Sequence, residues 1–207
     1  MTKLLLRGMA LTGLVLVLAG VLSGCPLAPV NIPDPNLELA LRKELNNPLG
    51  VLTKGDLGKI LELSAPGLSA PGASIVDLTG IENCTNLETL DLSGNAIVSI
   101  APLSGLAGLQ YLDLGGNQIT NIQPLSGLYA LTTVKLWGTG NAVLDYSPLV
   151  LNADGGGLIE GKVYLPAEKV LNSDESYKAY VAADVAALKS AGVTVIAITE
   201  ADASPSK

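Results

Sequence analysis

Residues 87–106 read LETLDLSGNAIVSIAPLSGL, and residues 109–128 repeat the pattern as LQYLDLGGNQITNIQPLSGL. A third copy opens at residues 131–138 with LTTVKLWG. The two complete copies begin 22 residues apart, and leucine, isoleucine, asparagine and proline return at the same places in each. A fixed period of this size indicates one small structural unit per copy, too small to bury its own apolar face. The copies must therefore stack on one another.

The spacing within one copy predicts its local structure. Leu90 and Leu92 lie two residues apart, so in an extended strand both point to one side while Asp91 points to the other. Asn95 suits the bend that follows, because its side-chain amide can pair with backbone groups that a turn leaves unpaired. Each copy is therefore expected to form a short strand, a turn and a return segment, with the leucines in the core.

The pattern resembles the internalin-like branch of the leucine-rich-repeat proteins, through the return segment Asn-x-Ile-x-x-Ile-x-Pro-Leu-x-x-Leu at 95–106 and 117–128. The resemblance implies an α/β fold, a solenoid whose parallel strands line a concave face. It also implies a helical amino-terminal cap and a helix-strand carboxyl-terminal cap. An ordinary amphipathic α/β stretch is the alternative, but it would not keep so many positions in register.

The composition limits the function classes. The chain has 207 residues, 48% of them hydrophobic, with no histidine, two cysteines and one tryptophan. The lack of histidine disfavours triad hydrolases and most zinc sites. The net charge of −7 argues against a nucleic-acid partner. We therefore expect one domain with ample material for a core, with no metal and no cofactor.

The first 24 residues resemble a lipoprotein signal peptide. Lys3 and Arg7 give a basic start, an apolar run follows, and Leu-Ser-Gly-Cys at 22–25 matches the bacterial lipobox. This resemblance implies cleavage before Cys25 and lipidation of its thiol, which would anchor the domain to a membrane. A plain secretion signal is the alternative. We expect a bacterial cell-envelope location, lipid-anchored, at the outer membrane or cell surface.

Prolines and helix-capping residues mark the boundaries of the segments before the repeats. Residues 25–33 are expected to form a proline-rich tether that holds the domain roughly 30 Å from the bilayer. Residues 34–60 are expected to form the helical amino-terminal cap, with Asp34 capping one helix and Thr53 with Asp56 forming a capping box. The repeats are expected to occupy residues 61–172.

Two features of the repeats are irregular. Leu61 and Leu63 are taken as the first strand, and the LSAPG of 63–67 is copied at 68–72, which predicts a surface loop. Thr139 stands where the pattern expects asparagine. Cys84 falls in register with inward-facing leucines, so it is expected to be a buried small hydrophobe and not a reactive thiol.

The end of the chain is expected to close the solenoid. Val163 and Leu165 supply a late strand, and residues 173–198 form the carboxyl-terminal cap. Within this cap a helix is expected from 174 to 191, ended by Gly192, and then a strand at 193–195. The apolar face of that helix is expected to hold Tyr177, Val181, Val185 and Leu188. Residues 199–207 are expected to be a tail.

Residues that alternate with the buried leucines should line up across the concave face, because equivalent positions of neighbouring strands form columns. One column is expected to hold Glu62, Asp91, Asp113, Lys135 and Tyr164. The columns beside it are expected to hold Thr89, Tyr111, Thr133 and Lys162, and Ser93, Gly115, Trp137 and Pro166.

These columns predict the binding site. The aromatic residues Tyr111, Trp137 and Tyr164 fall on the exposed face with polar neighbours, the usual composition of a binding hot spot. Asp91, Asp113 and Lys135 are expected to give it electrostatic selectivity. The leading hypothesis is a protein partner, still unidentified, and the alternative is a glycan or cell-wall polymer. Ordinary solvated strand positions remain an equally weighted interpretation.

An enzyme is the least favoured hypothesis. Asp91 and Asp113 on adjacent strands would lie about 5 Å apart, close to the carboxylate spacing of a retaining glycosidase. The repeat itself imposes that spacing, however, and nothing in the pattern predicts an enclosed pocket. We therefore predict no catalytic residue.

Overall fold

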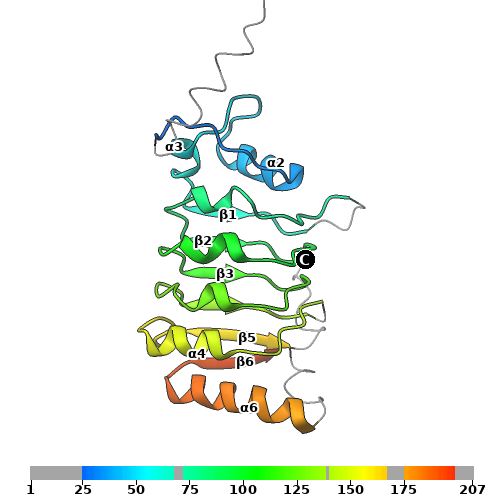
Figure 1. Ribbon diagram of the computed structural model, residues 1–207, viewed down its shortest axis with the longest axis vertical. Coiled ribbons are helices and arrows are strands. Elements are labelled where there is room, and N and C mark those ends of the chain that lie inside the picture. The colour runs from blue at the N-terminus through cyan, green and yellow to red at the C-terminus, as the bar shows by residue number, and fades with distance from the viewer. Residues whose placement is uncertain (1–24, 68–71, 139, 167–174, 199–207) are drawn as a thin grey trace, which may run out of the picture.

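A six-stranded sheet runs the length of the molecule in the order β1-β2-β3-β4-β5-β6, with every neighbouring pair parallel. The computed structural model describes residues 25–67, 72–138, 140–166 and 175–198, without the side chains of 175–180. The strands stack in chain order from one end to the other (Figure 1). Their bounds are β1 Glu62–Ser64, β2 Thr89–Asp91, β3 Tyr111–Asp113, β4 Thr133–Lys135, β5 Lys162–Pro166 and β6 Thr194–Ile198.

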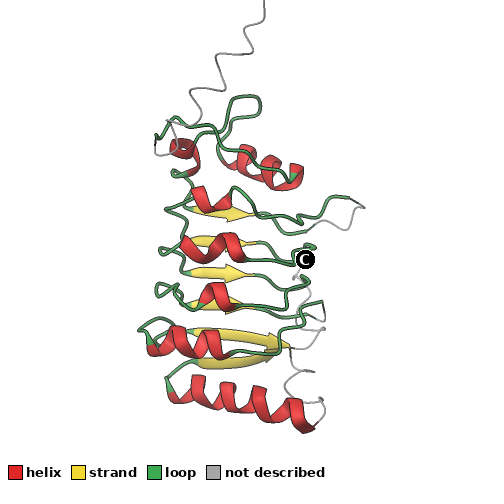
Figure 2. Ribbon diagram, viewed as in Figure 1, coloured by secondary structure: helices red, strands yellow, loops and turns green. Residues whose placement is uncertain are grey.

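Short helices make a second stack along one face of the sheet. Successive members of this stack contact one another, from the amino-terminal cap to the last helix. They follow the strands one by one, as Figure 2 shows. Their bounds are η1 Ile81–Asn83, η2 Ala101–Gly105, η3 Gln123–Leu125, α4 Ser147–Asp154 and α6 Glu175–Ser190. The expected α/β leucine-rich-repeat solenoid is confirmed.

The core lies between the two stacks. Leu90, Leu112 and Val134 are fully buried and lie opposite one another on β2, β3 and β4. Leu103 and Leu125 of the 3-10 helices are equally buried, each following a proline that starts its turn. Since each repeat buries its leucines against the next repeat, the period read from the sequence is also the period of the core.

A ladder of buried asparagines joins the repeats at the turn after each strand. Asn117 accepts a hydrogen bond from the Ile97 N–H (3.1 Å) and donates to the carbonyls of Leu92 (2.9 Å) and Leu114 (3.0 Å). Asn95 makes the same set of bonds one repeat earlier. The third member is Asn141, not a residue at position 139, which lies outside the described residues. Two extra residues move the asparagine along the chain without removing it from the ladder.

Glycine holds the backbone of the same turn. Gly94, Gly116 and Gly138 have φ angles of 70°, 66° and 91°, in the left-handed region that residues with a Cβ rarely adopt. Each follows its strand at the same place in the repeat. The turn therefore needs both a glycine for its conformation and an asparagine for its unpaired backbone groups.

The register of the first strand differs from the prediction. Leu63, not Leu61, lies opposite Leu90, and Leu61 is 52% exposed. The residues that fit the repeat are Ile60, Leu63 and Ala65, and the alanine at the last place hid the match. Glu62 consequently lies opposite Thr89, so its expected place beside Asp91 is wrong.

Two helices form the amino-terminal cap. Helix α2 spans Pro35–Glu44 and helix α3 spans Lys54–Leu57, and the expected caps are confirmed. The Asp34 carboxylate accepts from two N–H groups at the start of α2 and from the N–H groups of Val76 (2.7 Å) and Asp77 (3.1 Å). Asp34 thus joins the cap to the repeats. Burial acts to raise the pKa of Asp34, but these four N–H groups outweigh it, so the pKa is lowered.

The proline-rich segment before Asp34 is not a free tether. Ala28 and Ile32 are buried, and Pro29 pairs with Thr53 in an antiparallel bridge. The Gly55 N–H also donates to the Pro26 carbonyl at 2.7 Å. The expectation of a spacer is wrong, because Ala28 and Ile32 pack into the cap.

The other end of the solenoid is closed by α6 and β6. The helix runs as expected and the positive φ of Gly192, 84°, follows its end. Strand β6 begins one residue later than expected and continues to Ile198. Val181 and Leu188 are buried, whereas the side chain of Tyr177 lies outside the described residues. Among the described helices, none has both the length and the apolar character needed to cross a bilayer.

Candidate functional site

The residues predicted to bind lie together on the outer face of the sheet. Asp91 lies opposite Asp113, Asp113 opposite Lys135, and Lys135 opposite Tyr164. Tyr111 lies in the column beside them, opposite Thr133. We call this surface the strand face and define it by Asp91, Tyr111, Asp113, Lys135, Trp137 and Tyr164. Asp113 is buried, and the other five side chains are half-buried.

Lys135 is the centre of the strand face. Its Nζ lies 3.3 Å from Oδ2 of Asp113, 5.1 Å from the ring centroid of Tyr111 and 5.6 Å from that of Tyr164. A lysine within about 6 Å of a ring centroid is attracted by the negative face of the ring. One ammonium therefore ties together side chains from β3, β4 and β5.

The ionisation of this cluster follows from its burial. Burial raises the pKa of the Asp113 carboxyl, and the charge of Asp91 raises it further. The Gly115 N–H and the charge of Lys135 lower this pKa, but by less, so it is raised overall. Burial lowers the pKa of Lys135, but the side chain of Tyr111 and the Asp113 carboxylate more than compensate, so that pKa is raised. Lys135 therefore carries its charge throughout the neutral range.

Trp137 extends the strand face toward the turn. The indole lies over the backbone of Gly115, because a Cβ added at Gly115 would collide with the ring. Gly115 is buried beneath it. The repeat pattern placed Gly115 and Trp137 in one column, but it did not indicate that the indole packs on the glycine. A small residue with a large one opposite it in the next repeat is the signal that could have found this.

Both aspartates also serve the turn after their own strand. Oδ1 of Asp91 accepts from the N–H and the hydroxyl of Ser93, at 3.0 and 2.7 Å. Oδ1 of Asp113 accepts from the N–H of Gly115 at 3.0 Å. Part of their recurrence in the repeats is therefore structural. Asp113 is 5% exposed and ion-paired, which leaves little room for it to act as an acid or base.

The two cysteines differ in their surroundings. Cys84 is fully buried, and burial together with the charge of Glu82 raises the pKa of its thiol to about 12. This confirms that Cys84 is a core residue. Cys25 is half-buried at the first described position, beside α3. Among the described residues, no group of three or more histidine, cysteine or carboxylate side chains is placed to hold a metal ion.

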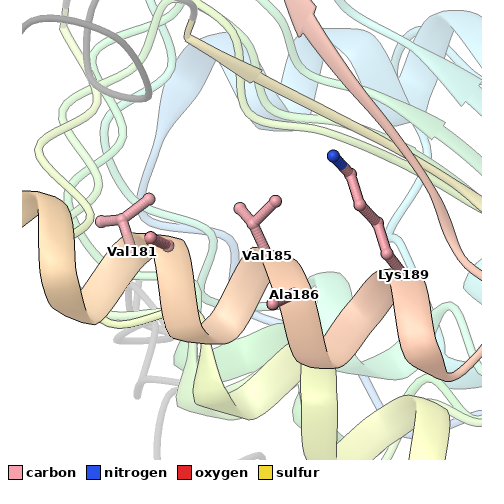
Figure 3. A pocket seen from close by; sticks show the side chains of 5 residues that line it. Val181, Val185, Ala186 and Lys189 are labelled. Carbon is pink, nitrogen blue, oxygen red and sulfur yellow. The ribbon is translucent and has the colours of Figure 1, made fainter.

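Three surface hollows that described residues line lie away from the strand face. One of about 230 Å³ follows α6, where Val181, Val185 and Lys189 project to the same side of the helix (Figure 3). A second lies between η2 and η3, and a third lies beside Cys25 in the cap. None of these three is lined by residues of the strand face.

The comparisons with known proteins agree with the repeat pattern. The family model for leucine-rich repeats matches residues 76–119 and 85–138. No curated protein matches the chain by sequence.

A solved structure of an internalin resembles the fold. This internalin (inlF) from Listeria monocytogenes is 26% identical with a TM-score of 0.61, and the match covers 84% of this chain. The match covers 59% of that internalin, so this chain spans less than two thirds of its length. Internalin C2 from the same organism is 23% identical with a TM-score of 0.40, covering 81% of this chain and 94% of that one. The structure of the CBM51-2 and INT domains of Clostridium perfringens ZmpB is 30% identical with a TM-score of 0.40, and the match covers 55% of this chain and 21% of that one.

Proposed function

We infer that this internalin-like leucine-rich-repeat protein is a non-enzymatic binding module that captures a protein partner on its strand face. Solenoids of stacked repeats present extended surfaces of this kind, and their strand residues can vary without disturbing the core. The observation that carries the inference is the cluster of Lys135 with Asp113, Tyr111 and Tyr164. A surface already fixed in one arrangement loses less conformational entropy on binding.

The strand face has the composition of a protein-binding hot spot. Tyr111, Trp137 and Tyr164 supply large apolar area, while Asp91 and Lys135 offer charges of opposite sign. The Trp137 indole rests on Gly115 and so has little freedom to lose. We propose these three aromatics as the anchors and the charged residues as the source of selectivity.

A protein partner is favoured over a glycan by the use of the tyrosine rings. Sugar-binding sites present free aromatic faces, but the rings of Tyr111 and Tyr164 both face the ammonium of Lys135. A glycan or cell-wall polymer remains the second outcome of the test below.

We also propose that the module is exported and lipid-anchored. Residues 1–24 would be the signal peptide, and Cys25 would carry the lipid in a bacterial cell envelope, at the outer membrane or the cell surface. The support is the lipobox at residues 22–25 and the half-exposed thiol of Cys25 at the end of the solenoid. Acylation there would leave the strand face uncovered.

Affinity capture tests the binding site. Residues 26–207 would be used to capture partners from bacterial and host extracts, and the affinity for the captured protein would then be measured. Tyr111→Ala with Trp137→Ala should weaken binding by about 30-fold or more, since two hot-spot side chains are removed. The thermal midpoint should fall by less than about 5 °C, because both side chains are only half-buried.

Tyr129→Ala is the matched control. Tyr129 is 55% exposed but lies between η3 and β4, away from the strand face, so its loss should leave capture unchanged. Equal loss of capture in both variants would overturn the site. Capture that survives protease treatment of the extract, but not removal of glycans, would favour the second function.

A further inference from the structure

We propose that the amino-terminal cap of this protein docks on the lipid bilayer through exposed apolar side chains carried at the same end of the solenoid as Cys25. This inference rests on the proposed lipidation of Cys25 and goes beyond it. A lipid anchor alone fixes only the distance of closest approach. The cap would in addition fix how the solenoid stands on the membrane.

The first observation is the alternation of side chains along the segment after Cys25. The bridge between Pro29 and Thr53 aligns this segment with the chain entering α3, and the Val30 N–H donates to the Leu52 carbonyl at 2.8 Å. Ala28 and Leu52 point inward and are buried. In an antiparallel pair, alternate residues of both chains share the opposite side.

Three apolar side chains of these two segments are exposed. Leu27 is 75% exposed and Val51 is 69% exposed, while Leu49 in the loop after α2 is 95% exposed. Single exposed leucines are common on soluble proteins, but three in two adjoining segments form a group. We call this group the cap patch and define it by Leu27, Leu49 and Val51.

The two segments that carry the cap patch contain no charged residue. Residues 25–33 read CPLAPVNIP and residues 45–53 read LNNPLGVLT. Two carboxylates of the cap are paired, Glu38 with Arg42 at 2.7 Å and Asp56 with Lys59 at 2.9 Å. Lys54 and Glu82 lie on another side of Cys25, where they line a hollow. A surface of this kind has a low desolvation cost when it enters the headgroup boundary of a membrane.

The position of the cap patch points to the bilayer as its occupant. Both segments lie at the end of the solenoid farthest from α6, the end that Cys25 occupies (Figure 1). Leu27 is two residues from the lipidated cysteine. The hydrogen bonds from Ala28 N–H to the Cys25 carbonyl (2.9 Å) and from Gly55 N–H to the Pro26 carbonyl (2.7 Å) leave no free linker between anchor and cap. Acyl chains on Cys25 would therefore bring the cap patch to the membrane surface.

An environment-sensitive fluorophore at Leu49→Cys in the full-length lipidated protein tests this proposal. Cys84 is fully buried with its pKa raised to about 12, and Cys25 would be acylated, so the probe attaches at position 49. In phosphatidylglycerol-containing vesicles the probe should shift to the blue, be quenched by brominated lipid and become several-fold less accessible to aqueous iodide. Ile159→Cys is the matched control, because Ile159 is equally apolar, 67% exposed and lies beside β5. It should show no change.

The outcomes separate the two proposals. Mass spectrometry showing no acyl group on Cys25 would refute the anchor and with it this inference. An acylated protein whose position-49 probe stays open to iodide would refute the docking alone. A probe protected from iodide but not quenched by lipid would place a protein, such as a second copy, over the cap patch and would also overturn the docking.

Discussion

Replacement of Asn117 by alanine should be among the most damaging single changes to this protein. The side chain accepts a buried hydrogen bond from the Ile97 N–H and donates to the carbonyls of Leu92 and Leu114. Alanine leaves the Ile97 N–H unpaired, whereas the two carbonyls keep a second bond, from Asn95 and from Asn141. An unpaired buried group costs about 1–3 kcal/mol and each lost hydrogen bond about 0.5–1.5 kcal/mol, so the variant should lose roughly 2–5 kcal/mol of unfolding free energy. Typical domains have only about 5–15 kcal/mol to lose.

Urea unfolding followed by circular dichroism measures this loss. Gln118→Ala is the control, since Gln118 is the exposed neighbour of Asn117 and should change stability by less than about 0.5 kcal/mol. Because repeat proteins are held by contacts between neighbours, the Asn117 variant should also show a lower m-value if the two halves separate. A loss below about 1 kcal/mol would refute the reasoning, because it would mean that the Ile97 N–H finds another partner.

Three further predictions concern the cap and the strand face. Asp34→Ala should lower the free energy of unfolding by about 2–5 kcal/mol, because it leaves four N–H groups without their acceptor. Since the pKa of Asp34 is lowered in the folded state, its contribution to stability should be present above its ordinary pKa and lost as the pH falls through the folded pKa. Urea midpoints measured across the acid range test this. Asp113→Asn should gain stability relative to the wild type as pH rises through the raised pKa of Asp113, and parallel unfolding series that stay a constant distance apart would contradict this. Gly115→Ala should displace the indole of Trp137 and shift the emission of the single tryptophan, whereas Gly127→Ala, with open space around its Cα, should leave the spectrum unchanged.

The repeat period made much of this fold predictable from the sequence. Leu90, Leu112 and Val134 were expected in the core, and Asp91 and Asp113 in one exposed column, because a strand places alternate residues on opposite sides. The helix caps at Asp34 and Thr53 were also predictable, since capping depends on residues only a few places apart.

Errors arose where long-range contacts replaced the local pattern. The first strand was set in the wrong register because Ala65 stands where later repeats have leucine, and only pairing with β2 fixes its place. The proline-rich segment looked like a free spacer because its composition favours an extended chain. Its backbone is extended, but Thr53 and its neighbours supply the partners that dock it.

The sequence by itself determined which residues face outward and which neighbours share a column, since both follow from the period of the repeat and the alternation of a strand. Only the tertiary structure decided what those neighbours do to one another. The place of Lys135 beside Asp113 and between the rings of Tyr111 and Tyr164 depends on the rotamers of side chains from three strands. Rotamers are chosen by packing between residues that are more than twenty places apart along the chain, and a periodic pattern carries no record of that choice.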